Sequence, residues 1–530
     1  MTASISQKIF SQFKKFFIFQ KSIFNLNFIH YLFSLYENRF LKKTKNIFIF
    51  DNFESFQNTF MRSLYLNFFS KILKTNLFYI NYKFNLLYKL IYFCLGSKNL
   101  RTNLSFNQKR ELEILHASFF NKVNSKQEIL DYEIDKINLG MDIYESYLIK
   151  FNEPTIRDIR VSNKKLNDLV RKSLKIFIFW RDYFLKNKHF IKGVLISHRN
   201  YVETNILNRI SIKNRINVYT LSGEGHSIQR WKNLDLNFFN YYSKIFENLS
   251  DKEKKEGILS GKKQLDKRFR GEVGVDMNYS TKSAFSKSDN KTDLLIKENN
   301  KVKVLICSAC FYDNPHCYGK MMFEDFYECL KFLGKLSKLT NYDWYIKPHP
   351  DYLPGTIENI NECMNFFDNL TLLNPSASFH TLKNKIDFAI TPYGSVGHEL
   401  PLLGIPVINC SNINPHQDFQ FNFTPKNKDE LKEIILNIKD IKNQNIDEIY
   451  KFYYIHYIFF NKSNLFSTEE ISKLNLNSNV NKEMINFFKS NLNNEKKYEL
   501  IENFIKKDEF KTSDRIFLEN INKLDNLNFK

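Results

Sequence analysis

KIDFAITPYGSVGHELPLLGIPVINC, residues 385–410, is the stretch that decides the fold of this chain. Its apolar run Phe388–Thr391 predicts a buried strand, and Pro392–Ser395 predicts a turn directly after it. A helix is then expected up to Gly404, because glycine is a common helix end, and Pro406–Asn409 predicts the next strand. Strand, turn, helix and strand in this order form a βαβ unit, which is typical of a parallel sheet.

A second informative stretch, YDWYIKPHPDY, lies upstream at residues 342–352. Trp344–Ile346 predicts a buried strand that stops at Lys347, because Pro348 and Pro350 have no N–H to donate to a sheet. His349 is therefore expected at the carboxyl end of a strand, where open α/β sheets bind their ligands.

These two turns together favour a phosphate site. The turn at Gly394–Gly397, which contains Ser395 and Val396, offers backbone N–H groups and the positive end of a helix. Lys347 could add a positive charge or point away along its strand. Glu399 lies one helical turn further and could accept hydrogen bonds from a ribose. Either turn alone would be ordinary, but each follows a predicted strand.

The K-P-H-P sequence and the glycine–serine turn followed by E-x-x-x-x-G-x-P-V resemble the nucleotide-binding half of GT-B glycosyltransferases. The likeness covers roughly 302–412 and is closest to capsule and surface-polysaccharide biosynthesis proteins, whose relatives are sialyl- and Kdo-type transferases and glycerophosphotransferases. It implies an α/β, GT-B-like fold: two Rossmann-like domains facing a cleft, with extra N- and C-terminal helices. It also implies that the donor nucleotide lies in the C-terminal domain and the acceptor in the N-terminal one.

A chain of 530 residues is long enough for two or three domains. Apolar runs at 46–50, 77–80, 190–196 and 218–221 predict strands in its N-terminal half. The expected segments are an amphipathic arm, an N-terminal Rossmann-like acceptor domain, a charged linker, a C-terminal Rossmann-like nucleotide-sugar domain and terminal helices, at 1–45, 46–250, 251–300, 301–440 and 441–530.

Candidates for the general base lie at predicted strand ends in the N-terminal half. Glu224 and His226 belong to the turn after the 218–221 strand, and His198 follows the 190–196 strand. In sialyltransferase-like relatives a short acidic-glycine motif supplies the base, and Glu224-Gly225 is similar to it. Another resemblance, F-x-D-x-P-H, implies that Asp313 and His316 reach the cleft. The stretch Arg268-Phe269-Arg270-Gly271 could reach a donor phosphate or an acceptor anion, although solvated linker charge is the simpler interpretation.

A net charge of +21 predicts attraction to anions, with phosphorylated substrates and anionic lipid ahead of nucleic acid, for which no recognition motif is present. AT-rich coding that inflates lysine is the alternative explanation. The chain has seven cysteines, an odd number that argues against a disulfide framework and fits a reducing cytoplasm. Cys307 and Cys310 fall in a predicted strand, so their thiols are expected to pack in the core. No metal ligand set and no cofactor is predicted, and no membrane-spanning run is found.

The arm at 1–45 mixes lysine with phenylalanine and could lie on the inner face of the cytoplasmic membrane or pack on the core. The predicted activity is transfer of a sugar from a nucleotide-sugar donor (CMP- or another NDP-sugar) to a surface or capsular polysaccharide or a lipid-linked acceptor, without a metal. The alternatives are a polyol-phosphate (CDP-glycerol type) transferase, a UDP-sugar 2-epimerase and a non-catalytic scaffold of a capsule complex.

Overall fold

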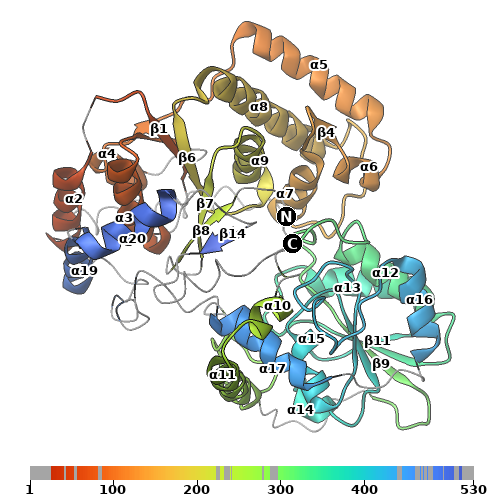
Figure 1. Ribbon diagram of the computed structural model, residues 1–530. Helices are drawn as coiled ribbons and strands as arrows, with labels where there is room; N and C mark the ends of the chain where they lie inside the picture. The colour runs from red at the N-terminus through yellow and green to blue at the C-terminus, as the bar shows by residue number, and fades with distance from the viewer. Residues whose placement is uncertain are drawn as a thin grey trace.

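A computed structural model describes residues 26–40, 43–52, 56–80, 86–222, 227–231, 239, 242–276, 280–286, 296–438, 445–459, 466, 470, 474, 481–492, 494–506 and 513–515. These residues form two α/β units that lie side by side, each built on its own sheet (Figure 1). The predicted α/β fold of two Rossmann-like units with additional N- and C-terminal helices is confirmed.

The N-terminal unit contains a seven-stranded sheet of order β14-β8-β7-β6-β1-β2-β3. Its strands are β1 (Ile47–Asp51), β2 (Asn76–Ile80), β3 (Lys98–Asn99), β6 (Ile191–Ile196), β7 (Val218–Ser222), β8 (Ser227–Trp231) and β14 (Ser513–Arg515). The strands from β7 to β3 run parallel, whereas β8 and β14 are antiparallel additions at one edge. Strands β1, β2, β6 and β7 match the strands that the apolar runs predict, whereas the short β3 was not predicted.

Helices cover both faces of this sheet because residues in its strands alternate between two cores. Phe48 and Phe50 of β1 enter one core, whereas Ile47 and Ile49 enter the other. The first core is covered by α2 (Leu26–Asn38), α3 (Phe56–Ile72), α4 (Leu86–Cys94), α19 (Lys482–Leu492) and α20 (Glu495–Lys506). The second is covered by α5 (Phe106–Lys122), α6 (Lys126–Leu130), α7 (Gly140–Phe151), α8 (Lys164–Asn187) and α9 (Ile206–Lys213), beside the small pair β4 (Glu133–Ile134) and β5 (Ile137–Asn138).

The two ends of the described chain meet in the first core. Helix α19 packs against α2 and α3, so the C-terminal helices return to the N-terminal unit (Figure 1). Phe28, Tyr31 and Leu35 of α2 are buried there, so one face of α2 packs on the core, whereas Leu26, Phe33 and Tyr36 are exposed. Among the described residues, no helix is both long and apolar enough to span a bilayer.

The C-terminal unit contains a five-stranded parallel sheet of order β11-β10-β9-β12-β13. Its strands are β9 (Lys303–Cys307), β10 (Asp343–Lys347), β11 (Leu370–Leu372), β12 (Phe388–Thr391) and β13 (Val407–Asn409). Helices α12 (Phe326–Ser337), α13 (Thr356–Met364) and α16 (Lys428–Leu436) cover one face. The other face carries α14 (Phe379–Leu382), α15 (Val396–Glu399) and the 3-10 turn η4 (Pro401–Leu403).

The charged segment 251–300, expected as a linker, is largely built into the C-terminal unit. Its first half is helix α11 (Asp251–Phe269), which packs on α17 (Asp447–Tyr453) and on the π-helix η6 (Tyr454–Phe459), beside α10 (Tyr242–Glu247). Phe285 from its second half is buried against the sheet, in the core that contains Phe379. The linker interpretation is therefore wrong for these residues, because their apolar positions enter two cores.

Candidate functional site

His349 stands at the carboxyl end of β10, as the two flanking prolines predict, and its side chain is exposed. Its Nδ1 accepts the backbone N–H of Asp351 at 3.1 Å. In the neutral ring the proton must then lie on Nε2, which is left as a donor. Desolvation lowers the pKa of His349. The charge of Asp351 raises this pKa, whereas the charges of Lys347 and Arg268 lower it. The imidazole is therefore a neutral donor at pH 7.

The second predicted turn follows β12. Gly394 N–H donates to Thr391 Oγ1 at 3.2 Å, and α15 begins two residues later at Val396. The predicted helix is present but short, because η4 begins at Pro401. Gly404, with φ of +86°, follows the end of η4. In the described part of the chain no acceptor is found for the N–H groups of Ser395 and Val396. Two backbone donors are thus available at this turn.

Arg268, at the end of α11, connects to the second turn and is not a solvated linker charge. Its Nε forms an ion pair with Glu399, and its Nη2 donates to Ser395 Oγ at 3.3 Å. Nε also lies 3.2 Å from Asp276 Oδ2. The sequence provides no local signal for this arrangement, since the four residues come from three separate segments.

The sheet order brings the two predicted turns to one edge. Strands β10 and β12 flank β9 and all three are parallel, so His349 and Ser395 leave the same edge two strand spacings apart, about 10 Å. Arg268 bonds Ser395 and its charge also acts on His349, which makes it common to both turns. Groups from three segments, the two turns and the end of α11, therefore lie at this edge of the sheet.

Three residues expected to bind the nucleotide are instead engaged by the protein. Lys347 is buried, and its ammonium donates to Pro375 O at 3.0 Å, so it points away from the turn; burial lowers its pKa to about 8. His316 is buried with Nε2 on Glu324 O and Nδ1 on the N–H of Met321.

Glu399 is likewise fully buried and paired with Arg268, so a ribose cannot reach its carboxylate in this arrangement. Sequence position predicts which strand or helix carries each of these side chains, but not which neighbour contacts it.

The loops of the two units meet beside this edge. Tyr201 begins the π-helix η1 (Tyr201–Asn205) just after β6, and its hydroxyl accepts from Asn314 Nδ2 at 2.9 Å. Tyr201 has φ of +66°, a conformation that is rare for an aromatic residue and is concentrated at functional sites. Asp313, next to Asn314, is exposed, and desolvation raises its pKa. His198 is exposed at the end of β6, whereas Glu224 and His226 lie outside the described residues.

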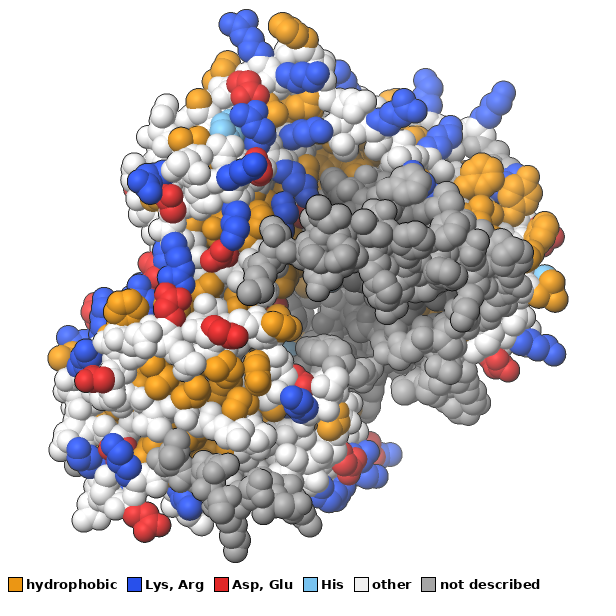
Figure 2. All heavy atoms as spheres, turned by 180° about the vertical axis from the view of Figure 1, so that it is seen from behind, with side chains coloured by type: hydrophobic (Ala, Val, Ile, Leu, Met, Phe, Trp, Pro, Cys, Tyr) orange, Lys and Arg blue, Asp and Glu red, His pale blue; other side chains and the backbone are white. Residues whose placement is uncertain are grey.

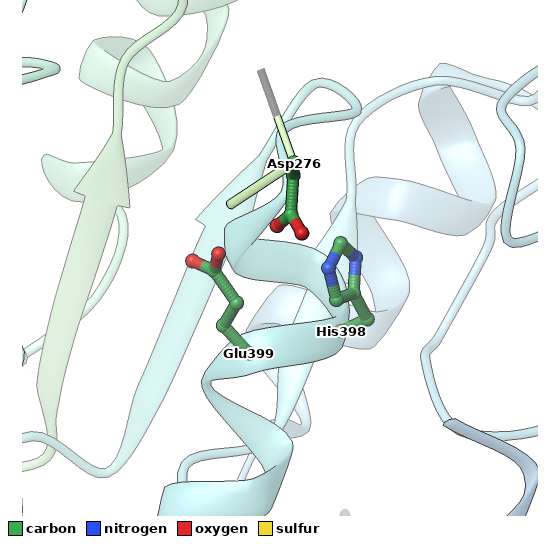
Figure 3. Close-up of side chains that lie close together, drawn as sticks. All are labelled: Asp276, His398 and Glu399. Carbon is green, nitrogen blue, oxygen red and sulfur yellow. The ribbon is translucent and has the colours of Figure 1, made fainter. Parts of the chain in front are cut away.

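Within the described residues one cluster could ligate a metal ion. Asp276, His398 and Glu399 place their ligand-type atoms within 4.8 Å of one another (Figure 3). His398 and Glu399 belong to α15, and Asp276 follows α11.

No protein-family model matches the chain, and no curated protein matches it either. Among solved structures, the KpsC beta Kdo 2,4 transferase of Thermosulfurimonas dismutans is similar over 50% of this chain and 80% of its own, with 12% identity and a TM-score of 0.33. A glycosyltransferase from Rickettsia africae ESF-5 matches 88% of this chain and 100% of its own, with 12% identity and a TM-score of 0.25.

The UDP-GlcNAc 2-epimerase of Neisseria meningitidis, bound to UDP-GlcNAc, matches 78% of this chain and 94% of its own, with 11% identity and a TM-score of 0.23. At these TM-scores the superpositions are loose, and none of the three assigns an activity to this chain.

Proposed function

We propose that this chain is a GT-B glycosyltransferase that moves a sugar from a nucleotide-sugar donor to a surface or capsular polysaccharide or a lipid-linked acceptor. The observation that carries the proposal is the group of hydrogen-bond donors at one edge of the C-terminal sheet. His349 Nε2–H and the N–H groups of Ser395 and Val396 come from turns that follow two strands of that sheet. An anion is the ligand that such a group of donors favours.

In this proposal the diphosphate or phosphate of the donor lies between the two turns. Sugar transfer leaves negative charge on the departing phosphate, and preorganised donors stabilise that charge most strongly in the transition state. Arg268 adds a fixed positive charge beside the Ser395 turn, because its Nη2 donates a hydrogen bond to Ser395 Oγ. These groups neutralise the leaving group without a metal ion that bridges the phosphates.

The acceptor would approach from the N-terminal unit, where Tyr201 and Asn314 join the two units. Asp313 is our candidate base among the described residues, because its exposed carboxylate has a raised pKa and is therefore a better proton acceptor than an ordinary aspartate. His198, Glu224 and His226 stay candidates for the same task. A lipid-linked acceptor would place the enzyme at the inner face of the cytoplasmic membrane.

The K-P-H-P resemblance favours a cytidine nucleotide in the donor. A thermal-shift panel of CMP, CDP, UDP and GDP tests this preference, and a response to GDP alone would remove it. Product analysis then identifies the group transferred: a glycosidic product supports the proposal, whereas a phosphodiester or a free epimer would assign the chain to polyol-phosphate transfer or to epimerisation.

The decisive variant is His349→Ala. Removing one preorganised donor to a developing anion typically lowers kcat about 10²–10³-fold. The exposed position of His349 predicts little change in the melting temperature. His189→Ala is the matched control, since His189 is exposed on the N-terminal unit. Equal turnover in the His349→Ala and His189→Ala variants would refute the proposed site.

A further inference from the structure

Three side chains form a buried set of metal-ligand type. Asp276, His398 and Glu399 point toward one another, with their ligand-type atoms within 4.8 Å (Figure 3). The carboxylates of Asp276 and Glu399 are 1% and 0% exposed, and the His398 ring is fully buried. Water therefore does not solvate these groups as it would at the surface.

In each of the three residues, one polar side-chain atom contacts a neighbouring residue and a second polar atom has no hydrogen bond within the described part of the chain. Glu399 Oε1 binds Arg268, Asp276 accepts from the Tyr453 hydroxyl, and His398 Nδ1 lies 3.2 Å from His416 Nε2. The remaining atoms, which are Glu399 Oε2, Asp276 Oδ2 and His398 Nε2, have no hydrogen-bond partner among the described residues, although Oδ2 lies at 3.2 Å from Arg268 Nε. Buried polar atoms without a partner are costly and require an explanation.

The charges of the cluster also favour a cation. Two carboxylates face one guanidinium, so one negative charge stays uncompensated in the interior when both acids are ionised.

We propose that Asp276, His398 and Glu399 bind a divalent transition-metal ion such as Mn²⁺ or Zn²⁺. An imidazole nitrogen with two carboxylate oxygens suits these ions better than Mg²⁺ or Ca²⁺, which prefer oxygen ligands alone. Metal–ligand bonds of about 2.0–2.2 Å require the three side chains to close in slightly from their present spacing. Arg268 and Tyr453 then act as the outer partners that orient the carboxylates.

The histidine chain behind the cluster is compatible with an ion at His398 Nε2. Asn422 Nδ2 lies 3.5 Å from His416 Nδ1, while Asn422 Oδ1 is buried without a partner. Turning this amide lets Oδ1 accept the His416 Nδ1–H. His416 Nε2 then accepts the His398 Nδ1–H, and the lone pair of His398 Nε2 faces the two carboxylates.

An ion at this position would be structural. It would tie the segment after α11 to α15, and so hold Arg268 in place. This site goes beyond the proposed transferase activity and does not depend on it, because binding of the ion is measured without nucleotide or turnover.

Mn²⁺ is the cleaner probe, since its preference for oxygen and nitrogen ligands avoids the free cysteines. The metal-free full-length protein is titrated with Mn²⁺, and the free ion is followed by electron paramagnetic resonance. We expect about one bound Mn²⁺ per chain, displaced by Zn²⁺, and affinity at least tenfold weaker in the Asp276→Asn and Glu399→Gln variants. Asp418→Asn is the control, because Asp418 is a half-buried acid of the same unit outside the cluster.

Circular dichroism checks that each variant is folded. If Glu399→Gln does not fold, Asp276→Asn alone serves as the test, because asparagine has the shape of the native aspartate. Absence of Mn²⁺ and Zn²⁺ binding to the wild-type protein would overturn the proposal. Wild-type affinity in a folded Asp276→Asn variant would do the same.

Discussion

Arg268 is the residue on which the charge balance of the candidate site depends. It is the cation nearest to the fully buried carboxylate of Glu399 and to Asp276. Removing one partner from a buried ion pair leaves the other charge unpaired, which typically costs about 3–5 kcal/mol. We therefore expect Arg268→Ala to lower the free energy of unfolding in urea by about this amount.

The neighbouring Arg270 provides the control for Arg268. Its side chain is 64% exposed and its partner Glu272 is 48% exposed, so Arg270→Ala should change stability little. If both variants unfold at the same urea concentration as the wild type, Arg268 does not hold the buried carboxylates in the way described.

Single residues of the site differ in how well the sequence predicts them. His349 and Ser395 are predictable because proline or glycine beside a strand end is a local signal of a presented turn. Arg268, Asp276 and Tyr201 are not predictable in this way, since their roles arise from contacts between distant segments. For Lys347 the sequence predicts the position at the end of β10 but not the direction of the side chain. Tertiary packing directs its ammonium to Pro375 O.

At the scale of elements, helix α15 depends on close packing against a buried histidine cluster. A Cβ added to Gly397 would lie 2.5 Å from His416 Cε1, and His416 itself is buried. Overpacking a rigid core typically costs about 1–3 kcal/mol. We expect Gly397→Ala to lower the free energy of unfolding by this amount, measured by urea denaturation.

A double-mutant cycle identifies the contact. In the His416→Ala background the ring is absent, so Gly397→Ala should cost much less than in the wild type. Equal costs in the two backgrounds would show that the glycine is required for another reason.

Strands of the C-terminal sheet were predicted more accurately than the helices around it. Continuous apolar runs bounded by turn residues indicate buried parallel strands, and β9, β10, β12 and β13 all follow such runs. By contrast, Pro401 divides the helix expected between Ser395 and Gly404 into α15 and η4. The antiparallel pair β8–β14 joins segments far apart in the chain, which no local pattern can indicate.

At the scale of the molecule, side-chain contacts hold the two units together. Tyr144 OH donates to Asp325 at 2.5 Å, Lys126 pairs with Glu328 at 2.6 Å, and Arg157 donates to Glu362 through its two terminal guanidinium nitrogens. By contrast, the excess of positive charge is spread out: Figure 2 shows basic side chains scattered over the face seen from behind, with acidic ones among them.

Glu145 is one of the buried acids at this junction, and its raised pKa predicts a pH dependence of stability. It accepts the N–H of His316 at 3.0 Å, and burial raises its pKa from 4.5 to about 8. Between these values the folded state retains a proton that the unfolded state releases, so this group lowers stability as pH rises, by about 1.4 kcal/mol per pH unit. Glu145→Gln should therefore gain stability relative to the wild type from pH 4.5 to 8 in urea denaturation.

A stability difference between the Glu145→Gln variant and the wild type that stays constant over this pH range would contradict the assignment. It would mean that Glu145 is ionised in the folded protein and that another group compensates its charge.

A crystal structure of the protein with CMP, CDP or UDP bound tests most directly whether the two turns after β10 and β12 bind phosphate. We expect a phosphate oxygen within hydrogen-bond distance of His349 Nε2 and of the N–H groups of Ser395 and Val396. A nucleotide whose phosphate lies away from this edge of the C-terminal sheet, out of reach of both turns, would contradict this expectation.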